Sequence, residues 1–239
     1  DLIKLDVIAF KTRFLVVFGL KKDPYLSYNS IQNIGLPKES ILFFVLSGGQ
    51  TKFDKNQKLN HKAVLPLLEE ISKIGEISLH PSYEASTDCS LLEIEKTELE
   101  SVCKKFINKS RFHFIRLKFP KSYECLILNK IIHDYSMGYP DLLGFRAGTC
   151  HSLFWYNLQN ETITNLRLHP FVAMDRTLCS YLKYDYNAAM TELLKLKELV
   201  KSYSGEFHLI WHNSSFDEHS EFLPYKALLL NFLGQEEVK

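Results

Sequence analysis

Two histidines follow short apolar segments that have the character of buried strands. His80 follows the segment 77–79 and precedes Pro81, which cannot continue a hydrogen-bonded ladder, and His212 ends the segment 207–211. In sheets of alternating strands and helices, ligands bind beyond the carboxyl ends of the strands. Two histidines at that edge suit metal binding or acid–base chemistry near neutral pH. The alternative is that two unrelated histidines each end a strand.

Arg111 and His113 lie two residues apart in the segment 111–117, which alternates as a strand does. Side chains at this spacing share one face of a strand, where they could orient an acid or bind a carboxylate or a sugar. The alternative is that Arg111 and Arg116 are ordinary surface residues.

Asp175 follows the apolar segment 170–174 and has two interpretations. Its carboxylate could hold a histidine in orientation, as carboxylates do for metal ligands and bases. It could instead cap the start of a helix near Thr177.

An aromatic-rich region interrupted by glycines covers residues 134–148. Tyr135, Tyr139 and Arg146, together with Trp155 further along, are candidate substrate-binding residues, because aromatic rings among a few polar groups suit sugar stacking. The alternatives are an ordinary ordered loop and a packing role for Trp155. The chain has no G-x-S-x-G nucleophile motif and no glycine-rich phosphate loop.

The elements that must position these residues alternate between strands and helices. Apolar segments predict strands at 41–46, 77–80, 111–117, 131–135, 153–156, 164–168 and 207–211. Helical spacing predicts helices at 28–33, 62–73, 90–107, 120–129, 187–203 and 221–232. Such alternation is typical of parallel βαβ units, and without a linker or internal repeat it predicts one domain over residues 1–239. In the second long helix, Glu93, Glu95, Lys96 and Glu98 are expected on a solvated face.

Composition narrows the class of protein. The 239 residues are 46% hydrophobic and 24% charged, and 29 basic against 28 acidic residues give a net charge of +1. No overall field attracts nucleic acid, and no apolar segment is long enough to cross a bilayer. Five cysteines without a C-x-x-C pair are expected to be reduced thiols, which favours a cytoplasmic location. The oligomeric state is left open.

Seven short motifs together resemble the polysaccharide deacetylase superfamily (NodB homology, carbohydrate esterase family 4), in particular a divergent bacterial branch associated with surface-polysaccharide genes. The resemblance covers about residues 22–213. Its motifs are Lys22-Asp23-Pro24-Tyr25, Leu79-His80-Pro81-Ser82-Tyr83, Ser110-Arg111-Phe112-His113-Phe114, Asp134-Tyr135-Ser136-Met137-Gly138-Tyr139, Gly144-Phe145-Arg146-Ala147-Gly148, Pro170-Phe171 with Met174-Asp175, and Trp211-His212-Asn213.

The resemblance implies an α/β fold, a distorted (β/α) barrel of about seven parallel strands. It also implies metal-assisted removal of an acetyl group from a sugar or polysaccharide, with a divalent ion, commonly zinc, as cofactor. His80 then resembles the first metal histidine, His212 the acid, and Arg111 the arginine that braces the base. Asp175 matches no general motif of the superfamily, and we keep it as a candidate catalytic residue.

The chain departs from the family pattern at the remaining metal ligands. Glu84 stands where a second histidine is expected, and His113 is the other candidate for that ligand. The aspartate pair of the first motif is not found as a pair. Asp1 is the candidate for its last residue, with the first strand and motif expected upstream.

Three functions follow from this pattern. The first is a metal-dependent deacetylase with a carbohydrate substrate. The second is an inactive barrel of the same type that grips a glycan through Tyr135, Tyr139 and Trp155. The third is another metal hydrolase on the same scaffold that acts on a small amide.

Overall fold

The computed structural model describes residues 14–16, 18–20, 28–49, 51–54, 56–216 and 223–234. The chain divides into two compact units. One comprises residues 1–35 with 211–239, and the other comprises Leu36–Ile210. Asp1 and the Lys22–Tyr25 motif lie outside the described residues. The expected single domain stays a prediction.

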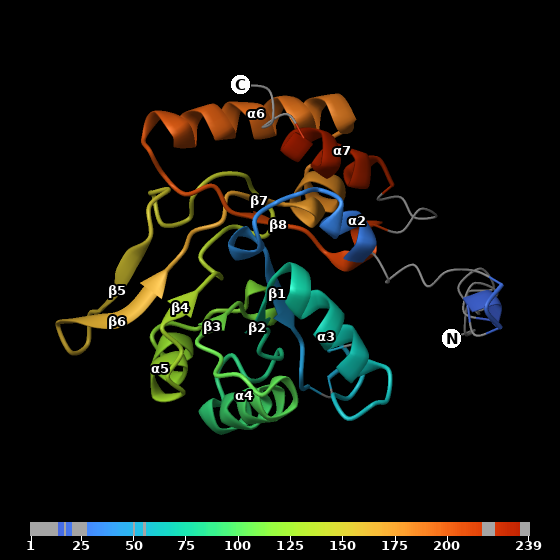
Figure 1. The fold of residues 1–239 in the computed structure, drawn as a ribbon. Coiled ribbons are helices and arrows are strands. Elements are labelled where there is room, and N and C mark those ends of the chain that lie inside the picture. Colours follow the sequence, from blue (N-terminus) through green and yellow to red (C-terminus); the bar gives the residue numbers. More distant parts are fainter. Residues whose placement is uncertain are drawn as a thin grey trace, which may run out of the picture. The chain divides into compact units, whose positions relative to one another are not determined.

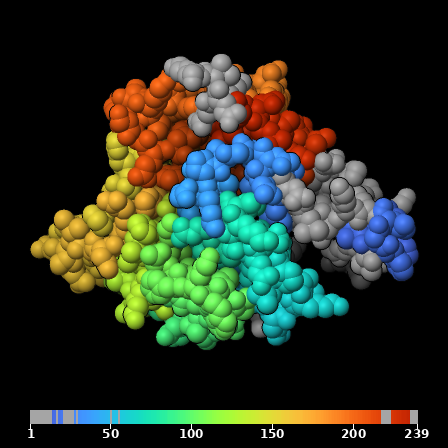
Figure 2. Space-filling model, viewed as in Figure 1, coloured from blue at the N-terminus to red at the C-terminus, as the bar shows by residue number. Residues whose placement is uncertain are grey.

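The larger unit is built on a mostly parallel sheet of six strands in the order β1-β2-β3-β4-β6-β5 (Figure 1). These strands are β1 (Leu42–Val45), β2 (Glu76–Leu79), β3 (Lys109–Ser110), β4 (His133–Asp134), β5 (Leu153–Asn157) and β6 (Thr162–Leu168). Only β5 is antiparallel, because it forms a hairpin with β6. The hairpin stands away from the rest of this unit in Figures 1 and 2.

A second, two-stranded parallel sheet pairs β7 (Ala173–Met174) with β8 (Leu209–Ile210). Phe171, Met174 and Ile210 form a small apolar cluster here, against which Ile115 packs. The α/β class and the parallel pairing are therefore confirmed. No closed barrel is formed by the described residues, and β2 and β8 belong to different sheets rather than to one shared edge.

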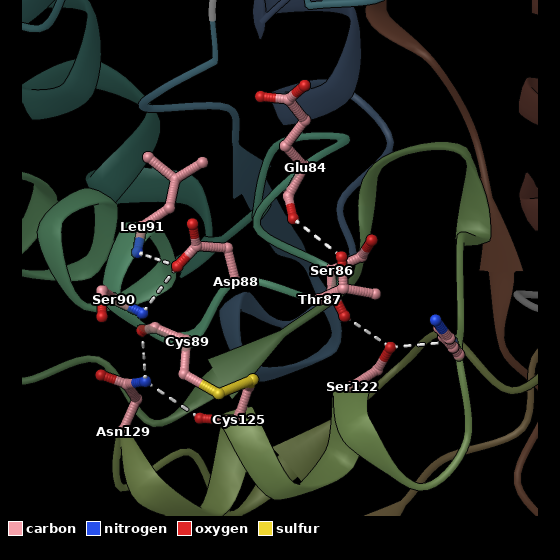
Figure 3. The surroundings of a disulfide bond; sticks show 11 residues. Glu84, Ser86, Thr87, Asp88, Cys89, Ser90, Leu91, Ser122, Cys125 and Asn129 are labelled. Atoms are coloured by element: carbon pink, nitrogen blue, oxygen red, sulfur yellow. Dashed lines mark hydrogen bonds between the residues drawn. A yellow bond between two sulfur atoms is a disulfide. The ribbon is translucent and has the colours of Figure 1, made fainter.

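Helices follow the strands as the periodicity predicts. They are α3 (Val64–Ile74), α4 (Cys89–Cys103), α5 (Lys121–Leu128) and α6 (Tyr186–Ser202), with the short helix η1 (Lys38–Ser40) before β1 and the π-helix η3 (Thr177–Tyr181) after β7. Asp88 begins α4 by accepting hydrogen bonds from the amides of Ser90 and Leu91 (Figure 3). The helices α3 and α4 contact one another, and α3 also contacts β2.

The two faces of the sheet differ in character. Leu79, Ser110, Asp134 and Leu168 are register partners on neighbouring strands and are all buried. The ladder continues for one residue, since the amides of Arg111, Tyr135 and His169 bond to the carbonyls of Leu79, Ser110 and Asp134. Side chains alternate along a strand, so the next residues point to the opposite face. We call these residues the polar row: His80, Arg111, Tyr135 and His169.

Two predictions about local structure are wrong. The strand expected at 111–117 ends at Ser110, and the chain turns into the short helix η2 (His113–Ile115). Glu95 and Lys96 of α4 are buried rather than solvated. Glu95 accepts a hydrogen bond of 2.9 Å from the amide of Ser82, and the ammonium of Lys96 lies 2.6 Å from Glu100. Glu95 is therefore buried because it holds the loop at Ser82, although its charged neighbours in the sequence predict a solvated face.

Cys89 and Cys125 form a disulfide between α4 and α5 (Figure 3). Asn129 donates hydrogen bonds to the carbonyls of both cysteines, which ties the two helices together next to the bond. This pairing corrects the expectation that all five cysteines are reduced thiols. Disulfides persist mainly in oxidising compartments, so the cytoplasmic location loses the support that it took from reduced thiols.

The other unit contains α2 (Tyr28–Gln32), η4 (Asn213–Phe216) and α7 (Leu223–Gly234). The helix α7 contacts η4 and buries Tyr225, Leu228 and Phe232. Across the described parts of both units, no helix has the length and apolar character needed to cross a bilayer.

Candidate functional site

Three side chains from separate segments meet beyond the carboxyl ends of β1, β2 and β3. His80 directly follows β2, and its ring lies 5.0 Å from the ring of His113 in η2, measured between centroids. Nδ1 of His113 lies 2.9 Å from Oδ1 of Asp54, which belongs to the loop after β1. Nδ1 of His80 is hydrogen-bonded to the carbonyl oxygen of Arg111. We call Asp54, His80 and His113 the Asp–His–His group.

The loop after β1 is shaped around the Asp54 carboxylate. Oδ2 accepts a hydrogen bond of 2.6 Å from the hydroxyl of Thr51, and Oδ1 accepts one of 3.0 Å from the amide of Tyr83. Gly49 has a φ of +91°, and a Cβ at this position would lie 2.5 Å from the Asp54 side chain. Only glycine adopts this conformation readily and leaves room for the carboxylate.

Hydrogen bonding decides the charge of Asp54. Burial alone would raise its pKa, but the hydrogen bonds from Thr51, His113 and the amide of Tyr83 hold the pKa below the ordinary value of 3.8. Asp54 is therefore an ionised, buried carboxylate at neutral pH.

Arg111 and Asp175 form a charged pair near this group. Burial lowers the pKa of the Arg111 guanidinium to about 10, and the negative charges of Asp175 and Asp134 oppose that shift. Asp175 is fully buried directly after β7, and its Oδ1 accepts a hydrogen bond of 2.8 Å from the amide of Arg176. Arg176, not Asp175, occupies the capping position of the following helix η3.

A buried network holds the segment 111–113 in place. Ser136 donates a hydrogen bond of 2.7 Å to Oδ2 of Asp134, and its hydroxyl oxygen accepts one of 2.9 Å from the amide of Phe112. Burial raises the pKa of Asp134 to about 6, although hydrogen bonds from Ser136 and Ser110 act against this shift. The ring of Phe112 is fully buried. The hydrogen bond to its amide and the burial of its ring fix Phe112 in place. Arg111 and His113, on either side of it in the chain, are therefore held in position through the backbone.

The backbone directly after His113 adopts an unusual conformation. Phe114 and Ile115 have φ values of 56° and 52°, in the left-handed region that residues with a Cβ rarely occupy. Each such residue costs about 1–3 kcal/mol, and such conformations concentrate at functional sites. This turn leaves the Phe114 side chain 57% exposed beside His113.

A second cluster lies at the other end of the polar row. Oε2 of Glu206 lies 3.1 Å from Nδ1 of His169 and 2.9 Å from Nε2 of His208. Of the described residues, only these three form a group of His, Cys, Asp or Glu side chains whose ligand atoms all lie within 4.8 Å of one another. We call them the His–Glu–His group, and it could hold a metal ion.

The structure brings together part of the predicted catalytic and metal set. The rings of His80 and His113 are neighbours. His80 is hydrogen-bonded to the carbonyl of Arg111, and His113 follows Arg111 two residues later in the chain. His212 lies between β8 and η4 in the other unit, where its carbonyl accepts a hydrogen bond from the amide of Ser215. Asp1 lies outside the described residues. Glu84 is exposed, so the carboxylate that meets the histidines is Asp54.

The predicted substrate-binding residues are distributed over several places. The Tyr135 ring stacks on His169 with centroids 4.5 Å apart, which places it at the His–Glu–His group. Trp155 packs edge-on against Tyr123 of α5. Arg146 is exposed, and Tyr139 is partly buried. These four residues do not form one binding surface around His80 in the contacts that the structure shows.

Sequence reasoning missed Asp54, His169, Glu206 and His208. Asp54 lies in the polar stretch Thr51–Asn60, which reads only as a loop. Its position in the sequence could have identified it, because a loop that follows a strand of a parallel sheet lies at the carboxyl ends of the strands, where ligands bind. Glu206 and His208 alternate directly before β8, a spacing that places both on one face of a strand.

No protein-family model matches the chain, and no curated protein matches it.

Proposed function

We propose that this chain is a metal-dependent hydrolase that removes an acetyl group from a sugar or polysaccharide, and that the Asp–His–His group binds its divalent ion, zinc. The observation that supports the proposal is the meeting of Asp54, His80 and His113 beyond the carboxyl ends of three neighbouring strands. His80 and His113 supply two imidazoles, which catalytic zinc sites use, and Asp54 is the carboxylate that orients His113. The ligand atoms of these three residues do not all lie within 4.8 Å of one another. In this proposal the six-strand sheet and the β7–β8 pair are parts of a distorted (β/α) barrel.

The protonation of the two histidines fits metal binding. A carbonyl oxygen only accepts hydrogen bonds, so Nδ1 of His80 must carry the proton that it donates to Arg111. A carboxylate also only accepts, so Nδ1 of His113 carries the proton that it donates to Asp54. In the neutral tautomer each ring then has an unprotonated Nε2, the atom that binds metal when the other nitrogen donates to a carbonyl or carboxylate.

The residues around the group have distinct roles in the proposed reaction. A divalent ion held by His80 and His113 would supply Lewis-acid chemistry: it would polarise the acetyl carbonyl and lower the pKa of an attacking water. Arg111 holds the Asp175 carboxylate through its opposite charge, and we propose that Asp175 accepts the proton of that water. The resemblance gives His212 the role of the acid that protonates the departing sugar oxygen or nitrogen; His212 belongs to the other unit, and this role stays a prediction.

A carbohydrate substrate is favoured by the aromatic side chains next to His113. Phe53 and Tyr83 stack with centroids 4.4 Å apart, and the exposed Phe114 ring lies 5.4 Å from Phe53. Arg116 lies over the Tyr83 ring at 4.4 Å. Exposed aromatic rings with a cation nearby offer apolar faces and hydrogen-bond donors to a sugar. The same surface also favours the second candidate function, a barrel that binds a glycan without hydrolysing it.

Acetate release separates the two functions. The substrate is an acetylated chito-oligosaccharide with added Zn²⁺, and the variant is His80→Ala, with the exposed His151→Ala as matched control. If the chain is a hydrolase, the wild type and His151→Ala release acetate and His80→Ala does not. If it is a binding module, no protein releases acetate and all three bind the oligosaccharide equally. Neither release nor binding by the wild type would refute both functions for this class of glycan.

A further inference from the structure

The His–Glu–His group offers donor atoms that no step of the proposed hydrolysis uses. His169 directly follows β6, and Glu206 and His208 directly precede β8. His80 and His169 stand on β2 and β6, which are three strands apart in the sheet order. At about 4.8 Å per strand, the two residues are separated by roughly 14 Å, too far for one ion to bind both.

We propose that His169, Glu206 and His208 bind a divalent transition-metal ion of the Zn²⁺ class, at a site separate from the Asp–His–His group. Ligand atoms around a tetrahedral ion at about 2.0–2.1 Å are roughly 3.3 Å apart. The two distances from Oε2 of Glu206, 3.1 Å to Nδ1 of His169 and 2.9 Å to Nε2 of His208, need to grow by only a few tenths of an ångström. Two imidazoles select such ions over Mg²⁺ or Ca²⁺, which prefer oxygen ligands.

The surroundings of His169 match those of a metal ligand. Nε2 of His169 lies 2.9 Å from Nδ1 of His133, so a ring that binds metal through Nδ1 can donate its remaining proton to His133. The Tyr135 ring lies parallel to the His169 ring, with an interplanar angle of 9°, and limits its rotation. The orientation of this ligand is therefore set before any ion binds.

Access from solvent completes the site. The Glu206 and His208 side chains are 41% and 32% exposed, whereas the His169 side chain is only 10% exposed. An ion can therefore reach the group from solvent and keep water in its remaining coordination position.

Metal stoichiometry tests this proposal. The full chain is equilibrated with excess Zn²⁺, dialysed, and analysed for bound ions per chain. We compare the wild type with Glu206→Gln, which preserves side-chain shape, with His208→Ala, and with the exposed His151→Ala as control. Circular dichroism confirms that each variant is folded. Replacement of Zn²⁺ by Co²⁺ supplies a second measurement, because the visible spectrum reports the ligands around the ion.

The proposal expects Glu206→Gln and His208→Ala to bind one ion fewer per chain than the wild type and His151→Ala. The Co²⁺ spectrum should lose the contribution of that ion. Equal stoichiometry and equal spectra in all four proteins would overturn it and leave a hydrogen-bonded cluster without metal. The His80→Ala variant keeps the outcome separate from the proposed hydrolase site: the His–Glu–His ion should stay bound to that variant, whether or not the Asp–His–His group binds another.

Discussion

Replacement of Asp54 by asparagine tests the centre of the proposed active site. Asn preserves the size of the side chain but removes the negative charge that accepts hydrogen bonds from Thr51, Tyr83 and His113. Hydrogen bonds to a charged group contribute about 1.5–3 kcal/mol each, against about 0.5–1.5 kcal/mol for neutral pairs. The loss of about 1 kcal/mol at each of three bonds gives an expected destabilisation of about 3 kcal/mol.

The same change should weaken metal binding. The Asp54 carboxylate orients His113 through the hydrogen bond to Nδ1, and loss of a partner that orients a ligand typically costs about 10–100-fold in metal affinity. Zinc affinity is measured by competition with a chelating dye, and stability by urea unfolding at pH 7. The Glu206→Gln background removes the contribution of the His–Glu–His group.

Glu84→Gln is the matched control for Asp54→Asn. Glu84 is an exposed carboxylate at the position where the family resemblance expects the second metal histidine. Its replacement should leave zinc affinity within about twofold and stability within about 0.5 kcal/mol, the range typical of surface substitutions. If Glu84→Gln weakens zinc binding and Asp54→Asn does not, the assignment of Asp54 to the site is wrong.

The effect of Asp54 on stability should also depend on pH. Its pKa is lowered in the folded state, so its contribution is present above the ordinary value of 3.8 and is lost as the pH falls through the lower folded value. The difference in unfolding free energy between wild type and Asp54→Asn should therefore shrink in acid. A difference that stays constant from pH 7 to pH 3 would contradict this account.

Three further predictions concern other parts of the larger unit. The pKa of Asp134 is raised from 3.8 to about 6, so its contribution to stability is present below 3.8 and lost as the pH rises through 6; Asp134→Asn should flatten the urea-unfolding free energy between pH 4 and 7, and an unchanged slope would refute this. The Cys89–Cys125 bond has a sequence separation of 36, so Cys125→Ser should cost about 4 kcal/mol in urea unfolding, whereas the unpaired Cys103→Ser should not; equal losses would count against the bond. Phe114→Ala should lower the affinity for an acetylated chito-oligosaccharide in calorimetry and leave the thermal midpoint nearly unchanged, because Phe114 is 57% exposed and Ala keeps the same backbone conformation; unchanged affinity would remove the aromatic surface from the binding site.

Local patterns predicted most of the elements of the fold. The helices α3, α4, α5 and α6 and the hairpin of β5 and β6 lie where hydrophobic periodicity places them, within a few residues at their ends. This succeeds because a helix or strand that buries one face repeats its apolar residues at a fixed period. The prediction of a strand at 111–117 is wrong because it relied on the same kind of local pattern. The residues alternate as in a strand, but Phe114 and Ile115 adopt a left-handed turn.

The charged residues show where local patterns fail. Glu95 reads as part of a solvated face, yet it is buried and bonds to the amide of Ser82 on a different segment. The cysteine spacing predicts no pairing, yet packing of α4 against α5 brings Cys89 and Cys125 together. In both cases the partner is distant in sequence, so no periodicity reports it.

The sequence by itself determined that His80 stands at the end of a strand in a parallel α/β protein, because apolar segments and the residues that end them are local; it placed Arg111 inside a strand that instead ends at Ser110. Only the tertiary structure decided which groups they meet. Asp54 contacts His113 across 59 positions of sequence, through a loop that turns at Gly49 with a φ of +91°. His169 meets Glu206 across 37 positions because β4, β6 and the approach to β8 come together. Such meetings depend on how loops close and sheets pair, and these are properties of the whole chain rather than of any segment.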